Sequence, residues 1–222
     1  MKIVSILDYG TGNITSLANA FGRLGAPCQI IKTVTQVQKA EILVLAGVGS
    51  FEEAMRRLER SGLGDAIRDA ANQRTIPVFG ICLGMQIFAE TGMEPHACRG
   101  LGLIKGSVRQ MENIHGLPLP HVGWNEVEWI RPLIAPRTLS FIDGHYYFDH
   151  SFALTDTEAH VVGTTHYGTR VTAAIWKDNI FGTQFHPEKS HLNGLKLIKT
   201  FLSFANGGLH TKAENGGLPE HA

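Results

Sequence analysis

The fold of this chain is decided by the stretch IPVFGICLG at residues 76–84. Its first six residues form a short apolar run typical of a buried β-strand, and a helix-like run follows at residues 83–90. Gly80 and Gly84 flank Cys82 at the point where strand gives way to helix. A G-x-nucleophile-x-G turn holds its central side chain on a strained corner, because its glycines admit close backbone contacts. The stretch therefore predicts an α/β fold with Cys82 at a strand-to-helix elbow.

The first 60 residues alternate between strand-like and helix-like patterns. Apolar runs indicate strands, and apolar residues at i, i+3, i+4 and i+7 indicate helices. Four such segments follow one another, at residues 3–7, 17–24, 41–46 and 51–58. Ser50 and Glu53 have the spacing of a capping box at the start of the last segment. Short buried strands that alternate with helices predict a largely parallel central sheet with helices on both faces.

After about residue 100 the pattern changes to segments rich in β-branched and aromatic residues. They span residues 102–111, 122–130, 141–154, 160–166 and 171–186. Residues 177–179 are typical of a hairpin turn, and one further helix is expected to end at Gly207. Residues 208–222 are polar and lack periodicity, which predicts a disordered tail. We therefore expect a single domain over residues 1–207, with additional antiparallel strands in its C-terminal half.

Charge and composition argue against several classes of protein. The chain has 20 basic and 20 acidic residues and is formally neutral, so nucleic acid and anionic membranes are not the expected partners. No apolar run approaches the roughly 20 residues of a membrane-spanning helix, and the N-terminus lacks a secretory h-region. Three cysteines without a CxxC pair predict free thiols in a cytoplasmic protein. The 11 histidines form neither HExxH nor a close cluster, so we expect no metal site.

Cys82 is the candidate nucleophile of this sequence. A helix N-terminus favours a thiolate, and the N–H group of Leu83 would point toward the same spot as an oxyanion donor. A base and an orienting group are supplied by His186 and Glu188, which project to one side of an extended backbone because they are two residues apart. The alternatives are a small buried Cys82 between two packing glycines and a solvated His–Glu pair.

A glycine-rich turn, Ala46-Gly47-Val48-Gly49, links the 41–46 strand to the next helix. The turn lacks the Lys-Ser/Thr pair of a Walker loop and the spacing of a dinucleotide fingerprint, so no nucleotide cofactor is expected. Two interpretations remain for it. One is a simple tight turn, and the other is a source of a second N–H group for the oxyanion.

Taken together, these motifs resemble the triad-type, class I glutamine amidotransferases. The segments that carry the resemblance are DYGTGN (8–13), AGVG (46–49), CLGMQ (82–86), HVGWN (121–125), YYF (146–148), GTT (163–165) and GTQFHPEKS (182–190). They occur in the family's order and extend from residue 3 to about residue 205. Within the family, they are most similar to the glutaminase subunits that supply ammonia for histidine biosynthesis.

The resemblance implies the chemistry of glutamine hydrolysis. Cys82 would attack the carboxamide of L-glutamine, His186 would protonate the departing ammonia, and the γ-glutamyl thioester would be hydrolysed to glutamate. The N–H group of Leu83 and one in Gly47–Val48 would bind the oxyanion. The positions implied to bind glutamine are Gly49, Gln86, Glu94, His150, Ser151 and Phe152, of which Glu94 would receive the α-ammonium group. No cofactor is implied.

The resemblance uses nearly the whole chain, so the acceptor chemistry would lie on a separate polypeptide. In the family this partner is a (β/α)8-barrel cyclase that makes imidazole glycerol phosphate and AICAR, and the two chains form a heterodimer. The positions implied to lie at the interface are Asn13, Trp124, Tyr147 and Lys189. The alternatives are ammonia supply to another pathway such as surface-polysaccharide amination, a thiol γ-glutamyl hydrolase, and a non-catalytic binding subunit.

Three positions depart from the family's usual pattern. Ala46 stands where the glycine turn usually begins with proline, Asp149 where a small apolar residue is common, and Phe152 where tyrosine is usual. Without the fixed φ of a proline, the turn at Ala46 is expected to switch its peptide orientation more readily.

Overall fold

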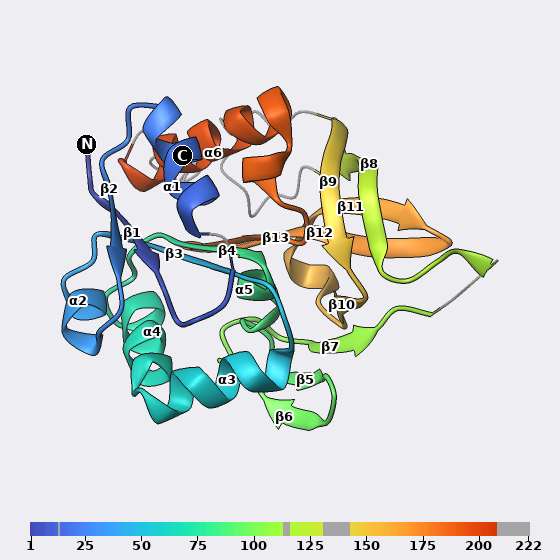
Figure 1. Cartoon of the computed structure of the whole chain (residues 1–222), viewed down its shortest axis with the longest axis horizontal. Coiled ribbons are helices and arrows are strands. Elements are labelled where there is room, and N and C mark those ends of the chain that lie inside the picture. The colour runs from blue at the N-terminus through green and yellow to red at the C-terminus, as the bar shows by residue number, and fades with distance from the viewer. Residues whose placement is uncertain (13, 113–115, 131–142, 208–222) are drawn as a thin grey trace, which may run out of the picture.

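A nine-stranded sheet runs through the molecule in the order β2-β1-β3-β4-β13-β12-β11-β8-β9 (Figure 1). The structure is a computed structural model that describes residues 1–12, 14–112, 116–130 and 143–207. The predicted tail, residues 208–222, therefore lies outside the described residues, as does part of the predicted 141–154 segment.

The first half of the large sheet is parallel. It consists of β2 (Cys28–Ile31), β1 (Val4–Leu7), β3 (Ile42–Gly47), β4 (Val78–Cys82) and β13 (Ile180–Thr183). Every residue of β1, β4 and β13 is buried, as expected of parallel strands covered on both faces. The carboxyl end of β4 thus lies between those of β3 and β13.

The second half is antiparallel and continues through β12 (Thr169–Lys177), β11 (Val161–Tyr167), β8 (His121–Trp129) and β9 (Gly144–His150). The predicted hairpin turn joins β12 to β13, with Asp178 at a φ of 51°. A smaller sheet has the order β10-β7-β5-β6. Its strands are β10 (Phe152–Thr155), β7 (Ser107–Gln110), β5 (Thr91–Met93) and β6 (Ala97–Arg99).

Helices cover both faces of the large sheet (Figure 1). One apolar core contains α1 (Ile14–Arg23) and α6 (His191–Ala205), and a second contains α3 (Phe51–Arg60) and α4 (Leu63–Asn72). The shorter elements include α2 (Val34–Gln38), α5 (Leu83–Gln86) and the 3-10 turns η2 (Glu158–His160) and η3 (Pro187–Lys189). The predicted fold class, a largely parallel sheet with helices on both faces and extra antiparallel strands, is confirmed.

Two local predictions need correction. The helix after Cys82 ends at Gln86 rather than at residue 90, because its last turn is tightened and the carbonyl groups of Ile87 and Phe88 accept N–H groups from Leu101 and Leu103. The predicted capping box at the start of α3 is also incomplete, as the contacts of that helix show.

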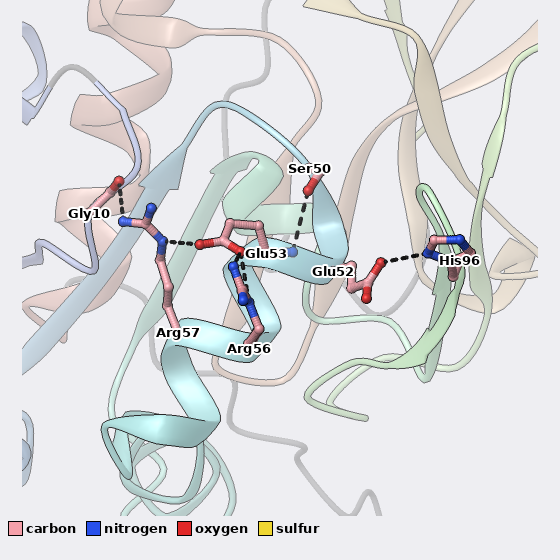
Figure 2. A network of polar contacts seen from close by, with 7 residues as sticks. All are labelled: Gly10, Ser50, Glu52, Glu53, Arg56, Arg57 and His96. Atoms are coloured by element: carbon pink, nitrogen blue, oxygen red, sulfur yellow. Dashed lines mark hydrogen bonds and ion pairs between the residues drawn. The ribbon is translucent and has the colours of Figure 1, made fainter.

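Ser50 caps α3 as predicted, but Glu53 does not reach back to it (Figure 2). The Glu53 carboxylate instead binds the guanidinium groups of Arg56 and Arg57 on the next turn. Arg57 Nη1 also donates to Gly10 O at 3.0 Å. These contacts tie α3 to the loop that follows β1, and that loop packs against the end of β3.

Candidate active site

The elbow places Cys82 at the last position of β4, directly before α5. Its backbone has a φ of 54° and a ψ of −113°. Residues other than glycine rarely adopt these angles, and they do so where the surrounding structure enforces the conformation. The side chain is 5% exposed. Because Leu83 is the first residue of α5, its N–H group has no intrahelical acceptor. The elbow thus places the N–H group of Leu83, which α5 leaves without an intrahelical acceptor, directly after Cys82 in the chain.

The two glycines of the elbow are required by packing. A Cβ on Gly80 would lie 2.5 Å from the ring of Phe88, and one on Gly84 would lie 2.0 Å from Leu45 O. Both distances are far below normal contact, so neither position tolerates a side chain. The G-x-C-x-G spacing is therefore a consequence of how closely α5 packs on β3 and β4.

His186 and Glu188 are brought next to Cys82 by the neighbouring strand β13. His186 Nδ1 donates to Glu188 Oε1 at 2.8 Å, and their side chains are 5% and 7% exposed. The backbone of His186 is also fixed, since its N–H group donates to Tyr147 O and its carbonyl accepts from Ser190 Oγ. The pair is buried, which excludes the alternative of a solvated His–Glu pair.

The electrostatics of His186 favour its protonated form. Burial disfavours the imidazolium, but the negative charges of Cys82 and Glu188, together with the hydrogen bond to Glu188, outweigh that effect and raise the pKa of His186 to about 10. Nε2 of His186 is buried and has no hydrogen-bond partner among the residues that the structure describes. The nitrogen that is not held by Glu188 is therefore available to exchange a proton at the Cys82 side of the ring.

A cavity of about 150 Å³ opens beside the sulfur of Cys82. Its lining contains all six positions that were predicted to bind glutamine, together with two of the predicted oxyanion positions. The lining residues are Val48, Gly49, Cys82, Leu83, Gln86, Glu94, Asp149, His150, Ser151 and Phe152. Gly47 and His186 do not line it; Gly47 is instead the strand partner of Cys82 in the β3–β4 register.

Glu94 provides a carboxylate to the lining of the cavity. Its Oε2 atom accepts the N–H group of Phe51 at 3.1 Å, at the N-terminus of α3. Burial raises the pKa of Glu94, and the hydrogen bond from Phe51 opposes that effect. A cationic group bound in the cavity would find an anionic partner here.

The loop after β1 packs tightly onto Gly47. A Cβ on Gly47 would lie 2.5 Å from Tyr9 Oη and 2.6 Å from Thr11 Oγ1. Both hydroxyl groups are buried and have no hydrogen-bond partner within the described part of the chain. Gly47 ends β3, Val48 is 46% exposed and Gly49 has a φ of 109°. The turn is thus confined on the Gly47 side and open at Val48.

The sequence reasoning gave no role to two side chains of the site. Gln184 Nε2 lies 3.7 Å from Cys82 Sγ, and His121 contacts His150, which lines the cavity, through their ring nitrogens at 3.1 Å. The available signal for Gln184 was its place directly after the predicted strand and two residues before His186, although residues 184 and 185 form a bend rather than extended backbone. His121 carried no such signal, because its contact depends on the pairing of β8 with β9.

Three of the four predicted interface residues form one surface cluster, and Asn13 lies outside the described residues. Trp124 is 46% exposed and packs edge-on against Tyr147, with ring centroids 6.1 Å apart. Lys189 Nζ lies 5.2 Å from the centroid of the Tyr147 ring and 4.0 Å from Asp149 Oδ2. Asp149, one of the departures from the family pattern, therefore links this cluster to the cavity that it lines.

Within the described ranges, no group of three or more His, Cys, Asp or Glu side chains is arranged to hold a metal ion. No helix in these ranges combines the length and apolar character that crossing a membrane requires.

Comparison with known proteins supplies the family. The family model for class I glutamine amidotransferases matches residues 5–203. Imidazole glycerol phosphate synthase subunit HisH 1 of Campylobacter jejuni is 41% identical over 200 residues, covering 90% of this chain and 99% of its own length. Subunit HisH of Moorella thermoacetica is 39% identical over 218 residues, covering 98% and 100%.

Solved structures agree on the fold. A glutamine amidotransferase crystal structure aligns with a TM-score of 0.71 at 18% identity, covering 91% of this chain and 98% of that one. A chain of the PurLQS structure from Thermotoga maritima aligns with a TM-score of 0.70 at 19% identity, covering 92% and 99%. The chain belongs to the class I glutamine amidotransferase family, and its relatives within that family include HisH subunits of imidazole glycerol phosphate synthase.

Proposed function

We propose that this protein hydrolyses L-glutamine to glutamate and ammonia, and that it passes the ammonia to the cyclase subunit of an imidazole glycerol phosphate synthase. The observation that carries the proposal is the position of the Cys82 sulfur. It lies at the edge of a cavity lined by the predicted glutamine-binding positions, and the buried pair His186 and Glu188 acts on it from the neighbouring strand.

The reaction begins with the Cys82 thiolate and protonated His186. The thiolate attacks the carboxamide carbon of glutamine, and the oxyanion is held by the Leu83 N–H group and an N–H group of the Gly47–Val48 turn. His186 gives its Nε2 proton to the amide nitrogen, the C–N bond breaks, and ammonia leaves a γ-glutamyl thioester. His186 then takes a proton from water, whose oxygen attacks the thioester, and glutamate leaves with the thiolate restored.

Glu188 and the cavity have supporting roles in this scheme. Glu188 keeps Nδ1 of His186 protonated, so Nε2 faces the reacting atoms. Glu94 binds the α-ammonium group of glutamine, and His150, Ser151 and Phe152 line the same cavity. One oxyanion donor is typically worth about 10²–10³ in rate, so the orientation of the Gly47–Val48 peptide is able to switch the enzyme on or off.

The partner surface is proposed to be the cluster of Trp124, Tyr147 and Lys189. An exposed tryptophan beside a tyrosine has the aromatic composition of an interface centre. The cluster adjoins Asp149, which lines the glutamine cavity. We expect the partner to be a (β/α)8-barrel cyclase that receives ammonia through this contact, because ammonia released into water would be protonated and lost as a nucleophile.

The test is glutamate release by the purified chain, measured alone and with the cyclase subunit of the same organism and its substrate. We expect the cyclase with bound substrate to stimulate release strongly. Short γ-glutamyl peptides run in parallel should remain uncleaved. Release without any stimulation by a cyclase that binds would favour ammonia supply to another pathway, and cleavage of the peptides would favour a thiol γ-glutamyl hydrolase. No release under any condition would identify a non-catalytic subunit.

A further inference from the structure

The thiol of Cys82 has a buried polar neighbour that the reaction scheme does not use. Gln184 is fully buried, and its Nε2 atom lies 3.7 Å from Cys82 Sγ. Its backbone is fixed directly after β13, where Gln184 N donates to Ala173 O at 2.8 Å. An amide nitrogen carries only donors and a thiolate only accepts, so this contact suits the charged form of the sulfur.

The orientation of the Gln184 amide is set by Gln86. Gln86 Nε2 lies 2.8 Å from Phe152 O and 3.0 Å from Gln184 Oε1. Because a backbone carbonyl only accepts, the amino group of Gln86 has to face Phe152, and its second N–H group then donates to Gln184 Oε1. The amino group of Gln184 is left pointing at the sulfur. Both N–H groups of Gln86 are engaged in these hydrogen bonds, so only its Oε1 atom is available to glutamine.

Two histidines continue this hydrogen-bond network beyond the Phe152 carbonyl. His150 Nδ1 lies 2.9 Å from Phe152 O, and His121 Nδ1 lies 3.1 Å from His150 Nε2. The carbonyl requires a proton on His150 Nδ1, so His150 Nε2 accepts from His121 Nδ1, and His121 Nε2 accepts from Asn125 Nδ2 at 3.3 Å. Burial lowers the pKa of both rings to about 4, which keeps one proton on each. The donor and the acceptor of each hydrogen bond in this network are therefore fixed.

We propose that Gln184 is a positioning residue for Cys82, which donates an N–H group to the sulfur, favours the thiolate and holds it against the cavity. Gln86, fixed by the Phe152 carbonyl, prevents the Gln184 amide from turning its oxygen toward the sulfur. A hydrogen bond to the charged form of a group favours that form. The proposal rests on the role of Cys82 as nucleophile in the proposed function.

Other charged or titratable groups also face the sulfur, and they have to stay unchanged in a test. His186 is coupled electrostatically to Cys82 and is backed by Glu188, and Tyr9 approaches from the loop after β1. Three further titratable residues line the cavity together with Cys82: Glu94, Asp149 and His150. A useful substitution must therefore remove the Gln184 donor without moving any of these.

Gln184→Met meets this requirement, because methionine has a similar length and adapts to its surroundings but has no donor. The measurement is the rate of Cys82 alkylation by iodoacetamide across a pH series, followed by mass spectrometry of the Cys82 peptide. Cys28 and Cys98 serve as internal references. Loss of a hydrogen bond to a charged group is expected to slow alkylation of Cys82 about tenfold at neutral pH and to move its profile to higher pH.

Two further variants separate this role from a structural one. The double variant Gln86→Met with Gln184→Met removes both amides, so no buried donor is left unpaired, and it should slow alkylation as the single variant does. Thr183→Val is the matched control, since it removes a buried hydrogen bond to Phe185 O in the same segment without touching Cys82. Its alkylation should match that of the wild type.

Wild-type alkylation in both methionine variants would overturn the proposal, as would an equal loss in Thr183→Val. If Gln184→Met fails to fold, the double variant decides. The assay contains no glutamine, so its outcome is independent of whether the protein proves to be a glutaminase.

Discussion

Replacing Glu188 by glutamine tests how the buried pair controls the reaction. Glu188 Oε1 accepts from His186 Nδ1 at 2.8 Å, and neither side chain is more than 7% exposed. Glutamine has the same shape, and its carbonyl oxygen still accepts from Nδ1, so the ring keeps its orientation. The substitution removes the negative charge beside the imidazolium and places an amide NH2 group at the buried Oε2 position, which has no hydrogen-bond partner among the described residues.

The magnitude follows from the class of hydrogen bond that is exchanged. A hydrogen bond to a charged group contributes about 1.5–3 kcal/mol and a neutral one about 0.5–1.5 kcal/mol. A loss of about 1.4 kcal/mol in stabilising the imidazolium corresponds to about tenfold lower kcat/KM. His186→Ala removes the acid and base completely, and we expect it to cost about 10²–10⁴-fold. Glu188→Gln should therefore be the milder variant.

The charge of Glu188 also affects the pH profile. Cys82 and Glu188 together hold the pKa of His186 above its ordinary value, so loss of the carboxylate moves that pKa downward. The alkaline limb of kcat/KM, which reports loss of the imidazolium proton, should then move to lower pH.

Steady-state glutamate release with saturating cyclase and its substrate measures both effects. Glu128→Gln, which removes an exposed carboxylate of β8, is the matched control and should behave as wild type. The reasoning is refuted if Glu188→Gln is as damaging as His186→Ala, or if it leaves both the rate and the alkaline limb unchanged.

Three further predictions concern the elbow, the buried histidines and the glycine turn. Gly84→Ala should fail to fold or lose most of its stability, because its Cβ would meet a β3 carbonyl at 2.0 Å. Gly22→Ala on α1 is the control, because its Cβ would meet no described atom within 4 Å. It should raise the free energy of unfolding in urea by about 0.5–1 kcal/mol. Burial lowers the pKa of His121 and of His150 from 6.5 to about 4. Between pH 6.5 and about pH 4 the unfolded chain therefore binds more protons than the folded protein. Stability should fall by about 3 kcal/mol per group as pH drops through that window; a flat profile of unfolding free energy would contradict this. Ala46→Pro should lower basal glutamate release while stimulation by the cyclase persists, because proline fixes φ near −65°. Equal or higher basal release in the proline variant would contradict the looser switch.

The sequence was informative where structure is local. The strand-to-helix elbow at Cys82 and the alternation of strands and helices depend on neighbouring residues, and both could be predicted. The His186–Glu188 pairing could also be predicted from its two-residue spacing, although only His186 is extended and Glu188 lies in the 3-10 turn η3 rather than on the extended backbone that we expected. The glutamine-binding positions came from the family resemblance instead, and their roles remain predictions.

The contacts that could not be predicted depend on strands and segments that are far apart in the sequence. The contact of Gln184 with Cys82 requires β13 to lie beside β4, and the contact of His121 with His150 requires the β8–β9 register. The helix after Cys82 stops at Gln86 because a segment about 15 residues later supplies hydrogen bonds to its carbonyl groups. Such partners leave no periodic signal in a single sequence.

The most direct test of the central claim is glutamate release by Cys82→Ala in the presence of the cyclase and its substrate. Removal of the sulfur should abolish glutamine hydrolysis, while circular dichroism and cyclase binding stay as in the wild type. Ammonium supplied at high pH should restore synthesis by the partner, because only the nitrogen source has been removed. Glutamate release by Cys82→Ala at a rate near that of the wild type would contradict the account.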